Sequence, residues 1–152
     1  MWELKGTPAD AKRFAPFEPV RVLNYYDGPR IFTVLDADGS LCLACWSDED
    51  ETRSRFLVAP VTAAVVADLE SGRLTVREAL GQPRLWVVDL SHDGPIAGAW
   101  LVNRQDVPND AQPQPRATLR HAASLRAAVH AVRPAEIPER IAKGTAEVAP
   151  RD

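Results

Sequence analysis

The sequence is poor in sulfur-containing residues and has no long apolar run. Its 152 residues include two cysteines and one methionine. Small secreted domains usually carry several disulfides, so two cysteines argue against a disulfide scaffold. No run approaches the roughly 18 apolar residues of a membrane helix. Residues 1–5 lack the basic and apolar regions of a signal peptide. We therefore expect a cytoplasmic protein with reduced thiols.

The chain also lacks an excess of positive charge. It holds 18 Lys and Arg against 21 Asp and Glu, a net charge of -3, which argues against a general nucleic-acid-binding protein. The charge is unevenly distributed. Residues 1–115 contain 11 basic and 17 acidic side chains, and residues 116–152 contain 7 and 4. We expect the basic C-terminal part to dock on the acidic part or on an acidic partner.

Short apolar runs between turn residues predict an antiparallel sheet. The turns Asp27-Gly28-Pro29 and Asp36-Ala37-Asp38-Gly39 carry residues that tolerate tight hairpins. Residues 41–46 have almost no polar atoms, so we expect a central strand covered on both faces. The acidic run at residues 48–51 is expected to form a solvated turn. The predicted strands are residues 20–25, 30–35, 41–46, 55–59, 84–90 and 96–102.

Two short helices are predicted between the strand groups. Thr62 is the expected N-cap of the first, and Gly72 is its expected left-handed C-cap. The second starts at a capping box that pairs Thr75 with Glu78. We predict that residues 62–80 form two helices separated by a bend at Gly72.

The last predicted element is a helix at residues 116–133. Its apolar stripe includes Leu125, Val129 and Val132. A Pro-rich loop at residues 108–115 precedes it, and residues 134–152 are expected to form a flexible tail. The fold class predicted is α+β: one core domain at residues 1–107 with a mainly antiparallel twisted sheet of five or six strands, two inserted short helices and a C-terminal helix.

The C-x-x-C pair, Cys42 and Cys45, predicts buried thiols rather than a redox or metal site. The pair lies within a predicted strand, where residues three apart point to opposite faces. The sequence has no second cysteine pair, and its histidines are not at ligand spacing. We expect two unpaired structural thiols, no metal and no cofactor.

A small enzyme or ligand-binding domain is the alternative function, with a site formed only by the fold. His92, Asp93 and Arg104 are the polar residues expected to form it. The serines show no G-x-S-x-G motif, so we assign no catalytic residue.

The leading functional expectation is a non-enzymatic protein-interaction module, such as an accessory or regulatory subunit. Tyr25, Tyr26 and Arg30 combine the residue types of an interface hot spot. The Leu125–Val132 stripe is the second expected contact surface. We expect a homodimer or a complex with a protein partner, and no membrane or nucleic-acid partner.

Residues 22–90 resemble a bacterial domain family without an assigned function. The similarity rests on the Y-Y-D-G-P turn at residues 25–29, the acidic run at residues 48–51, the V-T helix start at residues 61–62 and the T-V-R-E-A-L stretch at residues 75–80. The resemblance implies an α+β fold in a bacterial cytoplasmic protein, and it implies no reaction or ligand.

Overall fold

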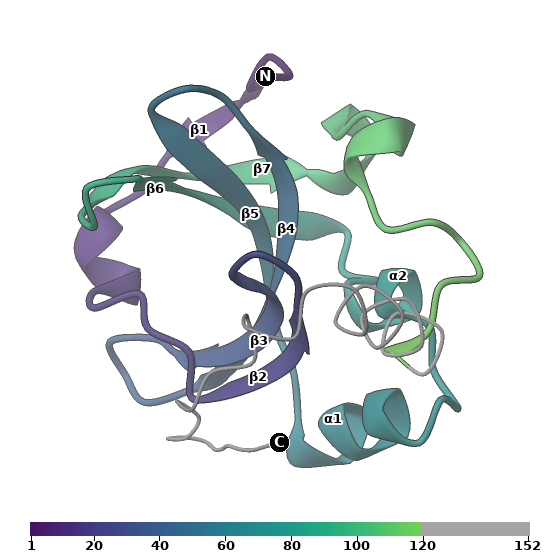
Figure 1. Cartoon of the computed structure of the whole chain (residues 1–152). Coiled ribbons are helices and arrows are strands. Elements are labelled where there is room, and N and C mark those ends of the chain that lie inside the picture. Colours follow the sequence, from purple (N-terminus) through teal and green to yellow (C-terminus); the bar gives the residue numbers. More distant parts are fainter. Residues whose placement is uncertain (120–152) are drawn as a thin grey trace.

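The computed structural model describes residues 1–119, which form one seven-stranded antiparallel sheet with the strand order β1-β7-β6-β5-β4-β3-β2 (Figure 1). The strands are β1 (Gly6–Pro8), β2 (Arg21–Tyr25), β3 (Pro29–Leu35), β4 (Leu41–Glu49), β5 (Arg53–Pro60), β6 (Arg84–Ser91) and β7 (Ile96–Asn103). The helices are α1 (Ala63–Glu70) and α2 (Val76–Ala79), and three short 3₁₀ turns are η1 (Ala11–Phe14), η2 (Arg104–Asp106) and η3 (Asn109–Ala111).

The sheet curls into an incomplete ring, and the segment from β1 through η1 to β2 spans the open side (Figure 1). This segment is tied to both ends of the sheet. The Ala9 amide donates to the carbonyl of Ala99 on β7 at 2.8 Å, and the Val20 amide donates to the carbonyl of Thr33 on β3 at 2.7 Å. Residues 9–20 therefore connect the two edges of the sheet.

Aromatic side chains fill the inner face of the curl. The ring centres of Phe17, Phe32 and Phe56 lie 5.4 to 5.6 Å from one another. Phe14 is fully buried and meets the ring of Trp86 edge-on at 5.6 Å. Since Phe14 and Phe17 come from the connecting segment, this segment supplies two of the five aromatic side chains that pack together on the inner face.

The outer face of the sheet is covered by α1, α2 and the chain after β7 (Figure 1). The sheet contributes aliphatic side chains from β3 to β7, and Leu69 and Val76 pack on them from the two helices. Val107, Ala111 and Leu119 are buried in the same cluster. The segment that sequence analysis assigned to a Pro-rich loop, residues 108–115, thus contains η3 and places Ala111 in this outer core.

The caps of both helices agree with the prediction. Thr62 accepts a hydrogen bond from the Val65 amide at 3.2 Å. The capping box is complete, because the Thr75 amide donates to Glu78 Oε1 at 2.9 Å and the Glu78 amide donates to Thr75 Oγ1 at 3.1 Å. Gly72 ends α1 with a φ of 80°, as the left-handed C-cap requires.

The predicted fold class is wrong in two respects. The sheet has seven strands rather than five or six, because β1, in the N-terminal region where no strand was predicted, pairs with β7. This strand, Gly-Thr-Pro, is exposed throughout and has no apolar alternation, so its pairing leaves no sequence signal. Residues 116–118 are not helical, Leu119 alone of the described residues in this range is, and residues 120–133 of the predicted helix lie outside the described residues.

The acidic run also departs from the predicted turn. Asp48 and Glu49 belong to β4, and the turn to β5 is made by Asp50 to Thr52. The Asp50 carboxylate accepts hydrogen bonds from the backbone amides of Thr52 and Arg53 at 2.9 and 3.1 Å. These hydrogen bonds, first of all the one from Thr52, lower the pKa of Asp50. One carboxylate therefore organises the turn that four acidic residues were expected to form.

A buried ion pair lies at one end of the outer face. Asp89 is fully buried and Arg55 is 4% exposed. Arg55 donates from Nε to Asp89 Oδ1 at 2.7 Å and from Nη2 to Asp89 Oδ2 at 2.8 Å. The ring of Trp2 covers the guanidinium at 4.8 Å, and the Trp2 carbonyl accepts a further hydrogen bond from it. The pair therefore anchors the N-terminal segment to the sheet.

Replacing Gly72 by alanine should destabilise the protein, because a Cβ is disfavoured at a φ of 80°. We expect Gly72→Ala to lower the free energy of unfolding by about 1 kcal/mol, measured by urea denaturation. Gly72→Asn is the control, and it should cost less because asparagine tolerates the left-handed region. A higher melting temperature for Gly72→Ala would contradict the assignment.

Removing the charge of Asp89 should be far more costly, because it leaves the Arg55 guanidinium buried without its counter-ion. We expect Asp89→Asn to lower the free energy of unfolding by about 3 kcal/mol or more. Asp68→Asn is the matched control, since Asp68 pairs with Arg73 at an exposed site and should contribute less than about 1 kcal/mol. Equal losses in the two variants would show that the buried pair has no special role.

Candidate functional site

The β2–β3 hairpin presents a tyrosine at its tip. Tyr25 pairs with Pro29, and the three residues between them form the loop. Asp27 and Gly28 have φ values of 55° and 119°, which turn the chain tightly. The Tyr26 amide donates to the Gly28 carbonyl at 2.9 Å, and Tyr26 remains 42% exposed. The hairpin tip therefore holds one half-exposed aromatic side chain in a well-defined backbone.

Arg30 is stacked on Trp46 beside this tip. Its guanidinium lies 4.7 Å from the centre of the Trp46 ring, within the range of a cation–π contact. Arg30 Nε donates to the Tyr26 carbonyl at 2.8 Å. Glu49 Oε1 accepts from Trp46 Nε1 at 3.2 Å and lies 3.5 Å from Arg30 Nη1. Both the arginine and the tryptophan are therefore held in place by the same carboxylate.

A bulge in β4 follows Trp46. The pairing with β5 shifts between Trp46 and Asp48, which leaves Ser47 out of register. The Ser47 hydroxyl is buried and donates to the Ala111 carbonyl at 2.7 Å, while it accepts from Trp2 Nε1 at 3.1 Å. The bulge thus ties β4 to both chain segments that cover this end of the outer face.

Tyr26, Arg30 and Trp46 border an open, mainly apolar groove of about 380 Å³. Its floor contains the buried side chains of Ile31, Cys45 and Val76, from β3, β4 and α2. We call it the Tyr26–Trp46 groove, and its lining residues are Asn24, Tyr26, Arg30, Ile31, Cys45, Trp46, Val76, Pro113, Ala117 and Thr118. A volume of this size lies at the low end of the range for small-ligand pockets.

Arg77 holds the far wall of the groove. Its guanidinium donates to the Pro113 carbonyl at 2.6 Å, to Asn109 Oδ1 at 2.9 Å and to the Asn109 carbonyl at 3.2 Å. The Val76 amide donates to the Ala117 carbonyl at 3.0 Å. Helix α2 therefore fixes the segment that forms the wall. Sequence analysis missed this role, because it gave Arg77 no function beyond its position inside the capping box.

Trp46 is the second functional residue that sequence analysis missed. The turn at residues 36–39 fixes the pairing of β3 with β4, in which Ile31 lies opposite Cys45. The same register places Arg30 beside Trp46. The turn was recognised from sequence. Counting the opposed residue pairs of β3 and β4 away from this turn would therefore have indicated the contact between Arg30 and Trp46.

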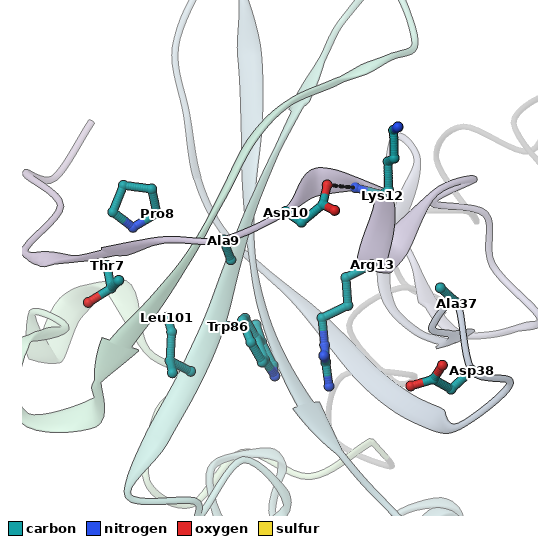
Figure 2. A pocket seen from close by; sticks show the side chains of 10 residues that line it. All are labelled: Thr7, Pro8, Ala9, Asp10, Lys12, Arg13, Ala37, Asp38, Trp86 and Leu101. Carbon is teal, nitrogen blue, oxygen red and sulfur yellow. Dashed lines mark hydrogen bonds between the residues drawn. The ribbon is translucent and has the colours of Figure 1, made fainter.

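A second concavity, of about 510 Å³, lies next to η1 (Figure 2). Trp86 forms one side, and the Arg13 guanidinium lies 4.5 Å from the centre of its ring. Figure 2 shows Lys12 directed away from Trp86. Asp10 caps η1 by accepting from the Lys12 amide at 2.9 Å. With Arg13 also 4.0 Å from Asp36, the charges here are balanced within the chain, and we do not assign a function to this concavity.

Cys42 and Cys45 are buried and unpaired, as predicted. They lie on opposite faces of β4, Cys42 in the inner cluster and Cys45 in the outer one. They therefore cannot bind one metal ion together. Burial raises the pKa of Cys42 to about 11 and that of Cys45 to about 12. Both thiols are protonated near neutral pH, which makes them weak nucleophiles.

The structure does not bring His92, Asp93 and Arg104 together. His92 and Asp93 lie in the turn from β6 to β7, where His92 Nε2 is 3.3 Å from Ser54 Oγ. Arg104 follows the other end of β7 and donates to the Arg77 carbonyl at 3.4 Å. The eight residues of β7 separate the two ends by roughly 25 Å. The polar site expected as the alternative is therefore not formed by these three residues.

The remaining predicted contact residues, Leu125, Val129 and Val132, lie outside the described residues. Within residues 1–119, neither helix is long and apolar enough to cross a membrane. In the same part of the chain, no group of three or more His, Cys, Asp or Glu side chains is placed to hold a metal ion.

Removing the Arg77 guanidinium should loosen the groove wall. We expect Arg77→Ala to lower the free energy of unfolding by about 2 kcal/mol, because three hydrogen bonds from a charged donor are lost. Hydrogen exchange at residues 109–118 should become faster while exchange in β5 changes less. Arg73→Ala is the control, because its ion pair with Asp68 is exposed. Unchanged exchange at residues 109–118 would contradict the proposed role of Arg77.

Comparison with known proteins gives one family match, which covers less than half of the chain. Residues 16–87 match the model of a family of unknown function (DUF6575). The match overlaps residues 22–90, where the sequence resembles an uncharacterised domain family, and it includes Tyr26, Arg30, Trp46 and Arg77. Neither a curated protein nor a solved structure matches the chain.

Proposed function

We propose that this protein is a non-enzymatic interaction module, an accessory or regulatory subunit that binds a partner protein through the Tyr26–Trp46 groove. The observation that carries the proposal is the stacked Arg30–Trp46 pair beside the half-exposed Tyr26. Tyr, Trp and Arg are the residues most enriched at interface hot spots. Here all three lie at one groove whose lining is mainly apolar.

The fixed geometry of the pair supports a binding role. Arg30 is held by the Tyr26 carbonyl, and both Arg30 and Trp46 contact the Glu49 carboxylate. Side chains that are already ordered lose less conformational entropy when a partner binds. The far wall is similarly fixed by Arg77. A partner would therefore meet a surface that needs little rearrangement.

The partner that fits this surface is an apolar segment of a protein with polar groups at its margin. The groove floor offers aliphatic and thiol surface, and Arg30 offers guanidinium donors at the rim.

We propose a bacterial cytoplasmic setting. Two unpaired thiols suit a reducing compartment, and the resemblance of residues 22–90 points to bacteria.

The test is site-specific photo-crosslinking in the native host. A photo-reactive amino acid in place of Tyr26 should capture one defined partner. The same amino acid at Leu35 should not, although Leu35 is exposed to a similar extent, 46% against 42%. Equal capture at the two positions, or capture at neither, would contradict the proposal.

The purified partner should then bind more weakly to Tyr26→Ala. We expect the dissociation constant to rise about 30-fold, as for loss of a hot-spot side chain. The control Leu35→Ala should leave the constant within a factor of about two. Both changes are at exposed positions, so the melting temperatures should stay close to that of the unmodified protein. An unchanged constant for Tyr26→Ala would place the binding surface elsewhere.

A further inference from the structure

Among the described residues that line the Tyr26–Trp46 groove, Arg30 alone is charged. Its side chain is 22% exposed, so solvent reaches the guanidinium only in part. The floor beside it is formed by the buried side chains of Ile31, Cys45 and Val76. A segment that fills the groove therefore meets apolar surface and one positive charge.

The Arg30 guanidinium has hydrogen-bonding capacity that the described residues do not use. Its Nε donates to the Tyr26 carbonyl at 2.8 Å. Its Nη1 lies 3.5 Å from Glu49 Oε1, which is a long contact for a hydrogen bond. Within residues 1–119, Nη2 makes no hydrogen bond. Since a guanidinium has five N–H donors, several of them stay available to a ligand.

Two other arginines of the outer face are paired more closely. Arg55 forms two hydrogen bonds with Asp89, at 2.7 and 2.8 Å. Arg77 forms three, at 2.6, 2.9 and 3.2 Å. These guanidiniums serve the fold, because the chain itself supplies their acceptors. Arg30 differs, since its one short hydrogen bond comes from Nε and leaves the Nη1–Nη2 edge for a ligand.

A carboxylate side chain is the group that best fits this edge. Its two oxygens match two parallel N–H donors of a guanidinium, and stacking on Trp46 at 4.7 Å fixes the plane of Arg30. Phosphate groups are bound by clusters of arginines, whereas this groove has one arginine with Glu49 beside it. A free C-terminus is captured by several backbone N–H groups, whereas the donors here belong to one side chain.

The acidic charge of the chain opposes such a contact only at long range. Residues 1–119 hold 12 Lys and Arg against 17 Asp and Glu, so the distant field favours a basic partner. Exposed charges more than about 8 Å apart are largely screened at physiological ionic strength, and partly buried pairs are screened much less. The pair formed at Arg30 therefore decides which segment binds, and the acidic surface slows its approach.

We infer that the partner segment carries an aspartate or glutamate next to a large apolar residue. The apolar side chain packs against Ile31, Cys45 and Val76, and the carboxylate binds the Nη1–Nη2 edge of Arg30. This inference rests on the proposed function, because it names the chemistry of the partner that the same groove binds. Arg30 is thus the residue that selects the partner, whereas the apolar floor supplies contact area.

The test is a selection of short random peptides from a display library on the full-length protein. Peptides that bind the groove are those whose binding is lost with Tyr26→Ala. They are synthesised with acetylated and amidated ends, so that any carboxylate belongs to a side chain. We expect these peptides to share an aspartate or glutamate adjacent to a large apolar residue.

Reversing the charge of Arg30 should reverse this preference. We expect Arg30→Glu to raise the dissociation constant of the acidic peptides about 30-fold. Lysine in place of the peptide's acidic residue should then restore most of the affinity, which also shows that the variant is folded. Arg21→Glu is the matched control, because Arg21 pairs with Glu70 at an exposed site outside the groove. It should leave the constant within a factor of about two.

Groove-binding peptides without an acidic residue would overturn the inference and leave the proposed function intact. Equal weakening of the acidic and lysine peptides by Arg30→Glu would also overturn it, because Arg30 would then only support the shape of the groove. A library that yields no peptide dependent on Tyr26 would overturn the proposed function, and this inference with it.

Discussion

The constraint that governs this structure is that its central strands are buried on both faces. The apolar residues of β4 and β5 alternate between the inner cluster of aromatic rings and the outer cluster of aliphatic side chains. A sheet of this kind is stable only if both faces are covered. The chain before β2 covers the inner face, and α1, α2 and the chain after β7 cover the outer face. The segments without regular structure are therefore as much a part of the core as the strands.

Arginine side chains connect these covering segments to the sheet. Arg55 holds the N-terminal segment through the buried pair with Asp89 and the ring of Trp2. Arg77 holds residues 109–113 on α2. Each guanidinium joins elements that are distant in sequence, because its planar array of donors can bond several acceptors at once. Arg30 has the same planar array of donors, and its guanidinium stacks on Trp46 at the rim of the groove. Arg30 is therefore suited to binding a partner.

The candidate site was predictable to the extent that it depends on one hairpin. Tyr26 and Arg30 were recognised from residue types in the Y-Y-D-G-P turn, and the turn at residues 36–39 contained the register that brings Trp46 beside Arg30. The opposite wall was not predictable. Pro113 and Ala117 carry no pattern that indicates packing on α2, and Arg77 is bonded to backbone carbonyls more than 30 residues away. Such long-range contacts leave no periodic signal in the sequence.

The sequence by itself determined the local elements. All six strands predicted from apolar runs are present, and so are the two short helices predicted at residues 62–80, because caps, turn residues and short-range alternation act between neighbouring residues. The tertiary structure decided what these elements enclose. It added β1, whose Gly-Thr-Pro sequence pairs through the backbone alone. It separated His92 from Arg104 and joined Trp46 to the chain after β7 in one groove. These outcomes depend on the curl of the sheet, which is a property of all seven strands together.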